Sequence, residues 1–126
     1  MNIMGKKVMI LDDQEFSRAT AITLLKNKGF KEFIECSDAQ DALEKYKKTK
    51  PYFVITDIIL PGMSGKEFLK KVLEFDPKAR VFVMSVLSRE EDMRDCLDLG
   101  SAGFLSKPLT ENKIEHVIYA LKHMGD

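Results

Sequence analysis

Five polar side chains stand at the ends of short apolar segments and could act together. They are Asp12, Asp13, Asp57, Ser85 and Lys107. If these segments are parallel strands of one sheet, with the first and third adjacent, the side chains converge on one crevice. Three carboxylates in one crevice repel each other unless a cation joins them. Carboxylate oxygens, with water completing the shell, suit Mg²⁺.

Such a site has the groups that phosphoryl transfer requires. A carboxylate can attack phosphorus and form an aspartyl phosphate. The transfer then depends on positioning and on cations placed against the phosphoryl oxygens. Mg²⁺, the Lys107 ammonium group and the Ser85 hydroxyl group could each hold one oxygen. A single acid at a strand end is more simply a helix cap, but three acids from two strands, with a lysine and a hydroxyl group, favour a binding site.

The elements that must position these residues alternate along the chain. The sequence contains five continuous apolar runs, which are typical of strands covered on both faces. They are Val8–Leu11, Phe33–Ile34, Phe53–Ile55, Val81–Met84 and Phe104–Leu105. The longer segments between them have an amphipathic pattern and predict helices. This alternation predicts an α/β fold of three layers, a doubly wound (βα)₅ with a parallel sheet between helices.

Helix starts and ends are marked by local signals. Capping-box pairs predict three starts: Ser37 with Gln40, Ser64 with Glu67, and Ser88 with Glu91. Glycine or proline predicts four ends: Gly29, Pro51, Pro77 and Gly100. In the fourth helix we expect Met93, Cys96 and Leu97 to pack in the core, although they could form a patch that faces a partner.

Composition restricts the function further. The 126 residues fit one domain, and Lys plus Arg (20) balance Asp plus Glu (20), so no nucleic-acid or membrane surface is indicated. No apolar run approaches the roughly 18 residues of a membrane span. No signal peptide is evident, and the two distant cysteines fit free thiols. We expect residues 1–126 to form a single domain without an output domain, in the cytoplasm.

The polar residues and their neighbours resemble the receiver domain of two-component response regulators. The motifs are Asp12-Asp13, Asp57 followed by Pro61-Gly62 and Gly65, Ser85, and Lys107-Pro108. The resemblance covers the whole chain and implies a flavodoxin-like sheet with strand order 2-1-3-4-5. It also implies a cis bond between Lys107 and Pro108.

Site roles follow from the same resemblance. It implies that Asp57 is the phosphoacceptor and that Ser85 and Lys107 contact the phosphoryl group. It implies that Mg²⁺ is held by Asp12, Asp13, Asp57 and the Ile59 carbonyl group. The phosphoryl group would come from a sensor histidine kinase or phosphotransfer protein. The protein would then signal to a downstream protein, as a monomer or a phosphorylation-dependent dimer, and would not be an enzyme with substrate turnover.

A switch is implied at Ser85 and Phe104. In the family the hydroxyl group moves toward the phosphoryl group, and the aromatic ring turns inward behind it. The fourth helix, fifth strand and fifth helix would form the readout surface. From spacing alone, Phe104 would be a core residue, and strand alternation places it on the opposite face from Leu105.

Ile59 and Leu87 occupy positions that influence phosphoryl lifetime in the family. Both are apolar, so neither can orient an attacking water molecule, and we expect a long-lived phosphoryl state. The alternative is that both side chains pack under helices.

Three other functions compete with the switch. A receiver-like interaction module would work without phosphorylation. An aspartyl-phosphate phosphatase would need a second acid at position 59, which is isoleucine. A flavin-binding module would need a phosphate loop rich in glycine and hydroxyl groups after Leu11, where acidic residues stand instead.

Overall fold

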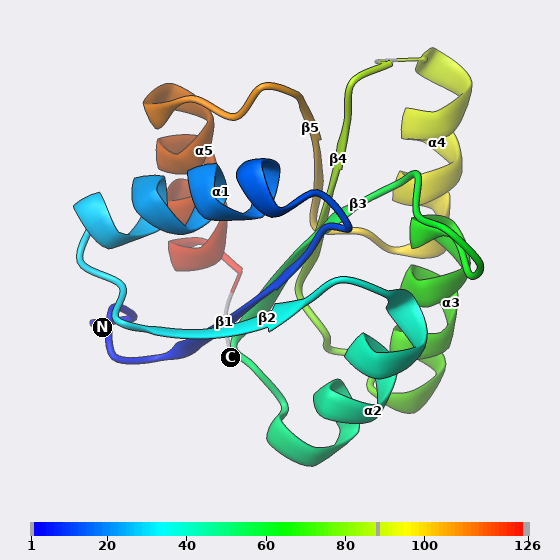
Figure 1. Cartoon of the computed structure of the whole chain (residues 1–126), viewed down its shortest axis with the longest axis horizontal. Coiled ribbons are helices and arrows are strands. Elements are labelled where there is room, and N and C mark those ends of the chain that lie inside the picture. The colour runs from blue at the N-terminus through cyan, green and yellow to red at the C-terminus, as the bar shows by residue number, and fades with distance from the viewer. Residues whose placement is uncertain (1, 88, 125–126) are drawn as a thin grey trace.

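The computed structural model describes residues 2–87 and 89–124, which form a parallel sheet between two layers of helices (Figure 1). The strand order is β2-β1-β3-β4-β5, as the resemblance implied, and every pairing is parallel. The strands are β1 Lys7–Leu11, β2 Glu32–Cys36, β3 Phe53–Asp57, β4 Val81–Ser85 and β5 Gly103–Ser106. The helices are α1 Glu15–Asn27, α2 Ala39–Thr49, α3 Gly65–Phe75, α4 Glu90–Leu99 and α5 Glu111–Lys122.

The two faces of the sheet carry separate apolar cores. Helices α1 and α5 cover one face, and α2, α3 and α4 cover the other (Figure 1). All residues of β3 and β4 are buried, which explains their continuous apolar runs. In β1, Met9 packs in one core and Ile10 in the other, because successive side chains of a strand point to opposite faces.

Strand order reverses between β1 and β3, at the centre of the sheet. β2 lies on the outer side of β1, whereas β4 follows β3 in the opposite direction. The carboxyl ends of β1 and β3 therefore border a crevice, which is where ligands bind in sheets of this type. Asp12 directly follows β1, and Asp57 is the last residue of β3.

Helix capping agrees with the sequence prediction at one start and differs at another. Ser64 caps α3, since its hydroxyl group accepts a hydrogen bond from the Glu67 amide at 3.1 Å. The prediction of a Ser37 cap for α2 was wrong by one residue. Asp38 is the cap and accepts from the Asp41 amide at 2.8 Å, since its carboxylate is the stronger acceptor. The pair predicted at Ser88 lies outside the described residues.

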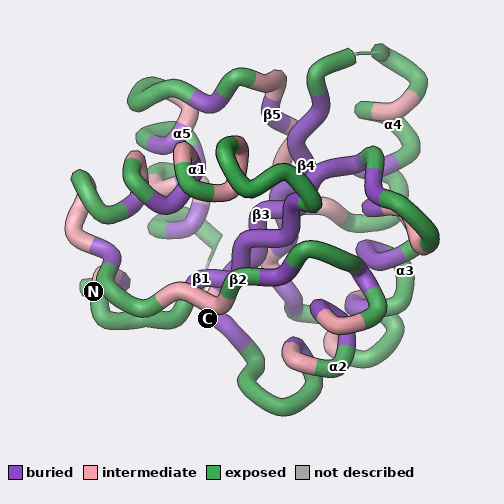
Figure 2. The backbone as a smooth tube through the Cα atoms, in the orientation of Figure 1, coloured by how far each residue is buried: buried purple, intermediate pink, exposed green. Residues whose placement is uncertain are grey.

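Helix α4 is attached to the rest of the domain by few apolar contacts. Among its described residues only Cys96 is buried, and Figure 2 draws most of the helix in the colour of exposed residues. The prediction that Met93 and Leu97 pack in the core was therefore wrong: their side chains are 38% and 48% exposed. Among the described residues of α4, Cys96 packs in the core, while Met93 and Leu97 lie on either side of it at the edges of the contact with the sheet.

Within residues 2–87 and 89–124, every helix is too short or too polar to span a bilayer.

Candidate phosphoryl-transfer site

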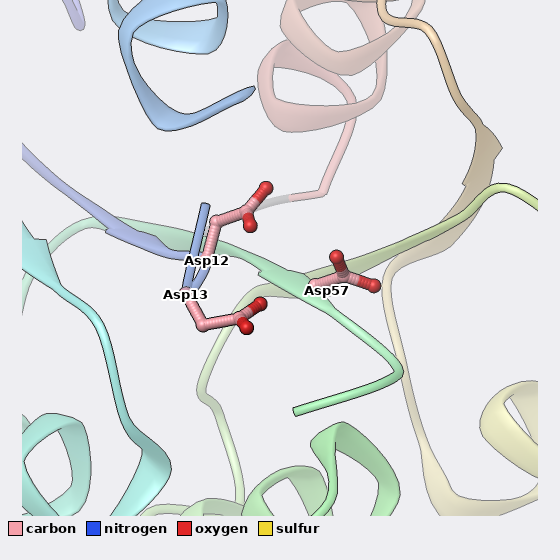
Figure 3. Close-up of side chains that lie close together, drawn as sticks. All are labelled: Asp12, Asp13 and Asp57. Carbon is pink, nitrogen blue, oxygen red and sulfur yellow. The ribbon is translucent and has the colours of Figure 1, made fainter. Parts of the chain in front are cut away.

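Three acidic side chains meet at the central crevice. Asp12 and Asp13 come from the end of β1, and Asp57 comes from the end of β3 (Figure 3). One carboxylate oxygen from each residue lies within 4.8 Å of the others, so that a single cation could contact all three. Asp12 and Asp57 are buried, whereas Asp13 is exposed. The arrangement could hold a metal ion with water completing its coordination, and hard oxygen ligands of this kind fit Mg²⁺.

Lys107 joins two of the acids. Its Nζ lies 2.7 Å from Asp57 Oδ2 and 2.9 Å from Asp12 Oδ2, and its side chain is 9% exposed. Burial by itself would lower the pKa of Lys107, but the hydrogen bonds to Asp57 and Asp12 outweigh it and raise the pKa above its ordinary value. The ammonium group therefore stays charged and partly neutralises the buried carboxylates.

Backbone groups fix the direction of the carboxylates. The Ile59 amide donates to Asp57 Oδ1 at 3.1 Å, and the Gln14 amide donates to Asp12 Oδ1 at 2.9 Å. Each of these two carboxylates thus has one oxygen held by its own loop and the other held by Lys107. This leaves Asp57 presented at the floor of a cleft of about 430 Å³, which Asp13, Ile59 and Lys107 help to line.

Ser85 reaches the same end of the sheet, but its hydroxyl group is engaged elsewhere. Ser85 Oγ donates to the Leu87 carbonyl group at 2.8 Å and accepts from the Leu87 amide at 3.1 Å. Its own carbonyl group accepts from the Lys107 amide at 2.8 Å, which ties the end of β4 to the residue after β5. The Lys107–Pro108 bond is cis, as the resemblance implied.

The two positions that the family resemblance associates with phosphoryl lifetime, 59 and 87, lie at the surface. Ile59 is 62% exposed and Leu87 is 45% exposed. The alternative that both pack under helices is therefore wrong. Both line a cleft between the loops that follow β3 and β4. Ile59 also lines the neighbouring cleft that contains Asp57, whereas Leu87 does not.

Phe104 lies on the face predicted from strand alternation. Its half-buried ring packs against the core that contains Cys96, whereas Leu105 packs in the opposite core. Phe104 also lines a groove between β5 and α5, together with Ala102 and His116. The ring is thus in contact with both the core and the surface of the expected readout face.

Arg18 belongs to the site region although no motif singles it out. Its Nη1 donates to the Asp12 carbonyl group at 2.7 Å, and its Nε donates to Glu35 at 3.1 Å. Arg18 therefore braces the loop that carries Asp12 and Asp13. Its place near the start of α1, about one turn beyond the acids, is the feature of the sequence that could have indicated this role.

Comparisons with known proteins agree with this geometry. A model of the response regulator receiver domain matches residues 8–119. The chemotaxis protein CheY of Thermotoga maritima is 31% identical over 111 residues, which are 88% of this chain and 92% of that protein. CheY of Treponema pallidum is 34% identical over 119 residues, which are 92% of this chain and 83% of that protein.

A solved structure is also similar over nearly the whole fold. The crystal structure of the CheX–CheY–BeF₃–Mg²⁺ complex from Borrelia burgdorferi matches with a TM-score of 0.88 and 31% identity, covering 93% of this chain and 89% of that one. The acids at the strand ends, the strand order and the family match over residues 8–119 lead to one conclusion: this chain belongs to the receiver domains of two-component response regulators and is similar to CheY.

Proposed function

We propose that this receiver domain is a phosphorylation-dependent switch in which Asp57 accepts a phosphoryl group. The observation that carries the proposal is the position of Lys107 between Asp57 and Asp12, at 2.7 and 2.9 Å, beside three carboxylates within 4.8 Å of one another. The Asp57 carboxylate thus lies between an ammonium group and a site for a cation. Both positive charges would stabilise the anionic phosphoryl group that this nucleophile receives.

The chain's own residues supply most of what the transfer needs. An oxygen of Asp57 attacks phosphorus, the bond from phosphorus to the donor histidine nitrogen breaks, and the imidazole leaves with its electron pair. Lys107 and the Ile59 amide hold the carboxylate in position for the attack. Asp12, Asp13, Asp57 and the Ile59 carbonyl group would hold Mg²⁺, which neutralises charge on the phosphoryl oxygens when it is bound.

An apolar groove beside the cleft supports a protein as phosphoryl donor. Phe16 is 85% exposed and Val86 is 69% exposed, and both line a groove that continues to Lys107. Exposed apolar surface of this kind is typical of protein contacts. A sensor histidine kinase or a phosphotransfer protein would place its phosphohistidine over Asp57 while it covers this groove. The two free, buried thiols suit a reducing compartment, so the proposal places the protein in the cytoplasm.

The output would be contact with a downstream protein through α4, β5 and α5. Exposed Met93 and Leu97 on α4 and the groove beside Phe104 support this surface. Ser85 and Phe104 would couple it to Asp57. To move the population of states from 1:99 to 99:1, phosphorylation must favour the active state by about 5.5 kcal/mol. The protein would act as a monomer or a phosphorylation-dependent dimer, without substrate turnover. That residues 1–126 work without an output domain stays a prediction.

The test is incubation with acetyl phosphate or phosphoramidate and Mg²⁺, followed by intact mass measurement. We expect a mass gain of one phosphoryl group that is lost in Asp57→Asn and when EDTA replaces Mg²⁺. Asp41→Asn is the matched control, because Asp41 lies in the first turn of α2 and pairs with Lys45. If neither donor modifies the wild-type protein with any divalent metal, the proposal fails in favour of an interaction module that works without phosphorylation.

A further inference from the structure

One lysine of α3 forms two ion pairs with α4. Lys66 Nζ lies 2.7 Å from Asp92 Oδ1 and 2.9 Å from Asp95 Oδ2. The Lys66 side chain is 31% exposed and the Asp92 side chain 22%, so the closer pair is partly shielded from water. Hydrogen bonds to Asp92 and Asp95 raise the pKa of Lys66 above its ordinary value. Since Cys96 is the single buried side chain among the described residues of α4, these ion pairs are a substantial part of its attachment.

The backbone next to Lys66 is fixed to the phosphoacceptor. The Gly65 amide donates to the Ile58 carbonyl group at 2.9 Å. A Cβ atom at Gly65 would lie 2.2 Å from the Asp57 carbonyl oxygen, so the first turn of α3 rests directly on the end of β3. The start of α3 is therefore packed tightly against the backbone of Asp57, and Lys66 extends from this point to α4.

The start of α4, one turn before Asp92, is also connected to Ser85. The Leu87 carbonyl group accepts one hydrogen bond from Ser85 Oγ at 2.8 Å and another from the Arg89 amide at 2.9 Å. Arg89 is the N-cap residue of α4, and its carbonyl group accepts from the Met93 amide at 3.1 Å. If Ser85 turns toward a phosphoryl group on Asp57, the Leu87 carbonyl group keeps its bond from the Arg89 amide but loses the donor that ties it to β4, so the loop that leads into α4 is held by one hydrogen bond less.

We propose that Lys66 is a positioning residue of the switch, whose ion pairs with Asp92 and Asp95 hold α4 in the arrangement in which Leu87 engages the Ser85 hydroxyl group. The inference rests on the proposed function of Asp57. An interaction that stabilises the state without a phosphoryl group lowers the affinity for any ligand that requires the other state. Loss of the Lys66 pairs therefore increases the affinity of Asp57 for a phosphoryl group or its mimic.

The test uses beryllofluoride, a mimic of the phosphoryl group on a carboxylate, at saturating Mg²⁺. We expect Lys66→Met to bind beryllofluoride about two- to fivefold more tightly than wild type, which is the range that one exposed ion-pair network can supply. Lys66→Arg keeps the charge and should stay close to wild type. Asp95→Asn breaks one of the two pairs from the side of α4 and should shift the affinity in the same direction by less. The Lys66→Met effect should shrink at high salt, because salt weakens the pairs in wild type.

Lys28 provides a matched control. Its Nζ lies 2.9 Å from Glu111 and 2.8 Å from Glu115, so it joins α1 to α5 by the same kind of pair of contacts. Lys28→Met removes an equal charge and an equal number of ion pairs, but it touches neither α4 nor the loop of Ser85. We expect its beryllofluoride affinity to equal that of wild type, while amide exchange in α4 accelerates only in the Lys66→Met and Asp95→Asn variants.

The outcomes are distinguishable. Electrostatics alone predicts weaker beryllofluoride binding when a cation near the site is removed. If wild type binds beryllofluoride and Lys66→Met binds it equally or more weakly, the role of Lys66 is overturned. The proposed function of Asp57 would then remain intact. An equal gain in Lys28→Met also overturns the role of Lys66. A wild-type protein that binds no beryllofluoride with Mg²⁺ overturns the proposed function and this inference together.

Discussion

The Ser85 hydroxyl group is bonded twice to Leu87, as a donor to the carbonyl group at 2.8 Å and as an acceptor from the amide at 3.1 Å. Ser85 is 1% exposed and ends β4, one strand away from Asp57. The hydroxyl group is thus close to the site and occupied by its own loop. Any contact with a phosphoryl group on Asp57 requires that the donor bond to Leu87 be exchanged for one to the ligand.

Replacement of Ser85 by alanine removes the hydroxyl donor both from the free protein and from the protein with a ligand on Asp57. A hydrogen bond to a charged group contributes about 1.5–3 kcal/mol and one to a neutral carbonyl group about 1 kcal/mol, so the exchange is worth about 0.5–2 kcal/mol and beryllofluoride binding with Mg²⁺ should weaken by about two- to thirtyfold. Titration followed by amide NMR shifts measures this. Ser85→Thr keeps the hydroxyl group and should bind more tightly than Ser85→Ala. Equal affinities for wild type and Ser85→Ala would exclude a contact between Ser85 and the phosphoryl group.

Lys107→Met should have opposite effects on metal binding and on phosphorylation. Without the ammonium group, Asp12 and Asp57 lose their cationic partner, and stability in EDTA should fall by about 3 kcal/mol. Mg²⁺ should bind more tightly because no positive charge competes with it, and excess Mg²⁺ should recover part of the lost stability. Phosphorylation by acetyl phosphate should nevertheless slow.

Urea unfolding with EDTA or with Mg²⁺ measures both stability effects. Lys71→Met is the control, since the ion pair of Lys71 within the described residues is an exposed one with Glu67 at 3.7 Å, and this variant should unfold like wild type. A Lys107→Met protein as stable as wild type in EDTA would contradict the importance of the pairs to Asp12 and Asp57.

Polar side chains at Ile59 or Leu87 should shorten the life of phosphorylated Asp57. Both positions are exposed, and Ile59 lines the cleft that contains Asp57 while Leu87 lines the cleft next to it. An amide at position 59 can therefore orient a water molecule toward phosphorus, and one at position 87 should act more weakly. One hydrogen bond worth about 1 kcal/mol corresponds to roughly fivefold faster decay in Ile59→Asn. Loss of the phosphoryl mass with time measures the rate, and Ile59→Leu is the apolar control. Identical decay in all three proteins would remove both positions from the site.

Gly65→Ala should destabilise the domain strongly. The added methyl group would lie 2.2 Å from the Asp57 carbonyl oxygen, which belongs to the rigid end of β3. Overpacking against backbone should cost about 3 kcal/mol or more, and phosphorylation should fall because Asp57 is displaced. Thermal unfolding compares it with Gly5→Ala, whose Cβ atom would meet nothing within 4 Å. Equal stabilities of the two variants would contradict the close contact.

The buried thiol of Cys36 gives stability a dependence on high pH. Burial raises its pKa from 9.0 to about 11. The folded state therefore favours the neutral thiol. This contribution is complete below pH 9 and is lost as the pH rises toward 11, because the unfolded thiol ionises first.

Comparison with Cys36→Ala isolates this contribution. Two pKa units correspond to about 2–3 kcal/mol, so the stability advantage of wild type over Cys36→Ala should narrow by up to that amount between about pH 8 and about pH 11. Urea unfolding under reducing conditions measures the gap at each pH. A gap that stays constant over this range would show that Cys36 ionises at its ordinary pKa in the folded protein.

Much of the fold could be predicted because its determinants are local in sequence. Buried parallel strands appear as continuous apolar runs, and Asp12, Asp13 and Asp57 could be brought together because the ends of such strands share one edge of the sheet. The strand order came from the family resemblance, since the apolar runs of β1, β3 and β4 do not differ in any way that orders them. The start of α2 was harder to predict, because Ser37 and Asp38 are adjacent and either side chain could accept a hydrogen bond from a free amide of the first turn. In the structure Asp38 is the acceptor.

Contacts between distant surface residues could not be predicted. Lys66 and Asp95 are 29 residues apart, and nothing in either local pattern relates them. The exposure of Met93 and Leu97 depends on the rotation of α4 over the sheet, in which Cys96 faces the core and Asp95 faces Lys66. The bonds of Ser85 to Leu87 depend on the shape of a loop that side-chain types do not determine.

The sparse attachment of α4 has a consequence for how such a domain can be redesigned. Of its ten residues, only Cys96 among those described is committed to the core, and Asp92 and Asp95 are committed to Lys66. If α4 contacts the downstream protein as proposed, the remaining positions can be exchanged to suit a different target without altering the carboxylates at the sheet edge. A new output specificity could thus be grafted onto one helix, while Asp57 and Lys107 are inherited unchanged.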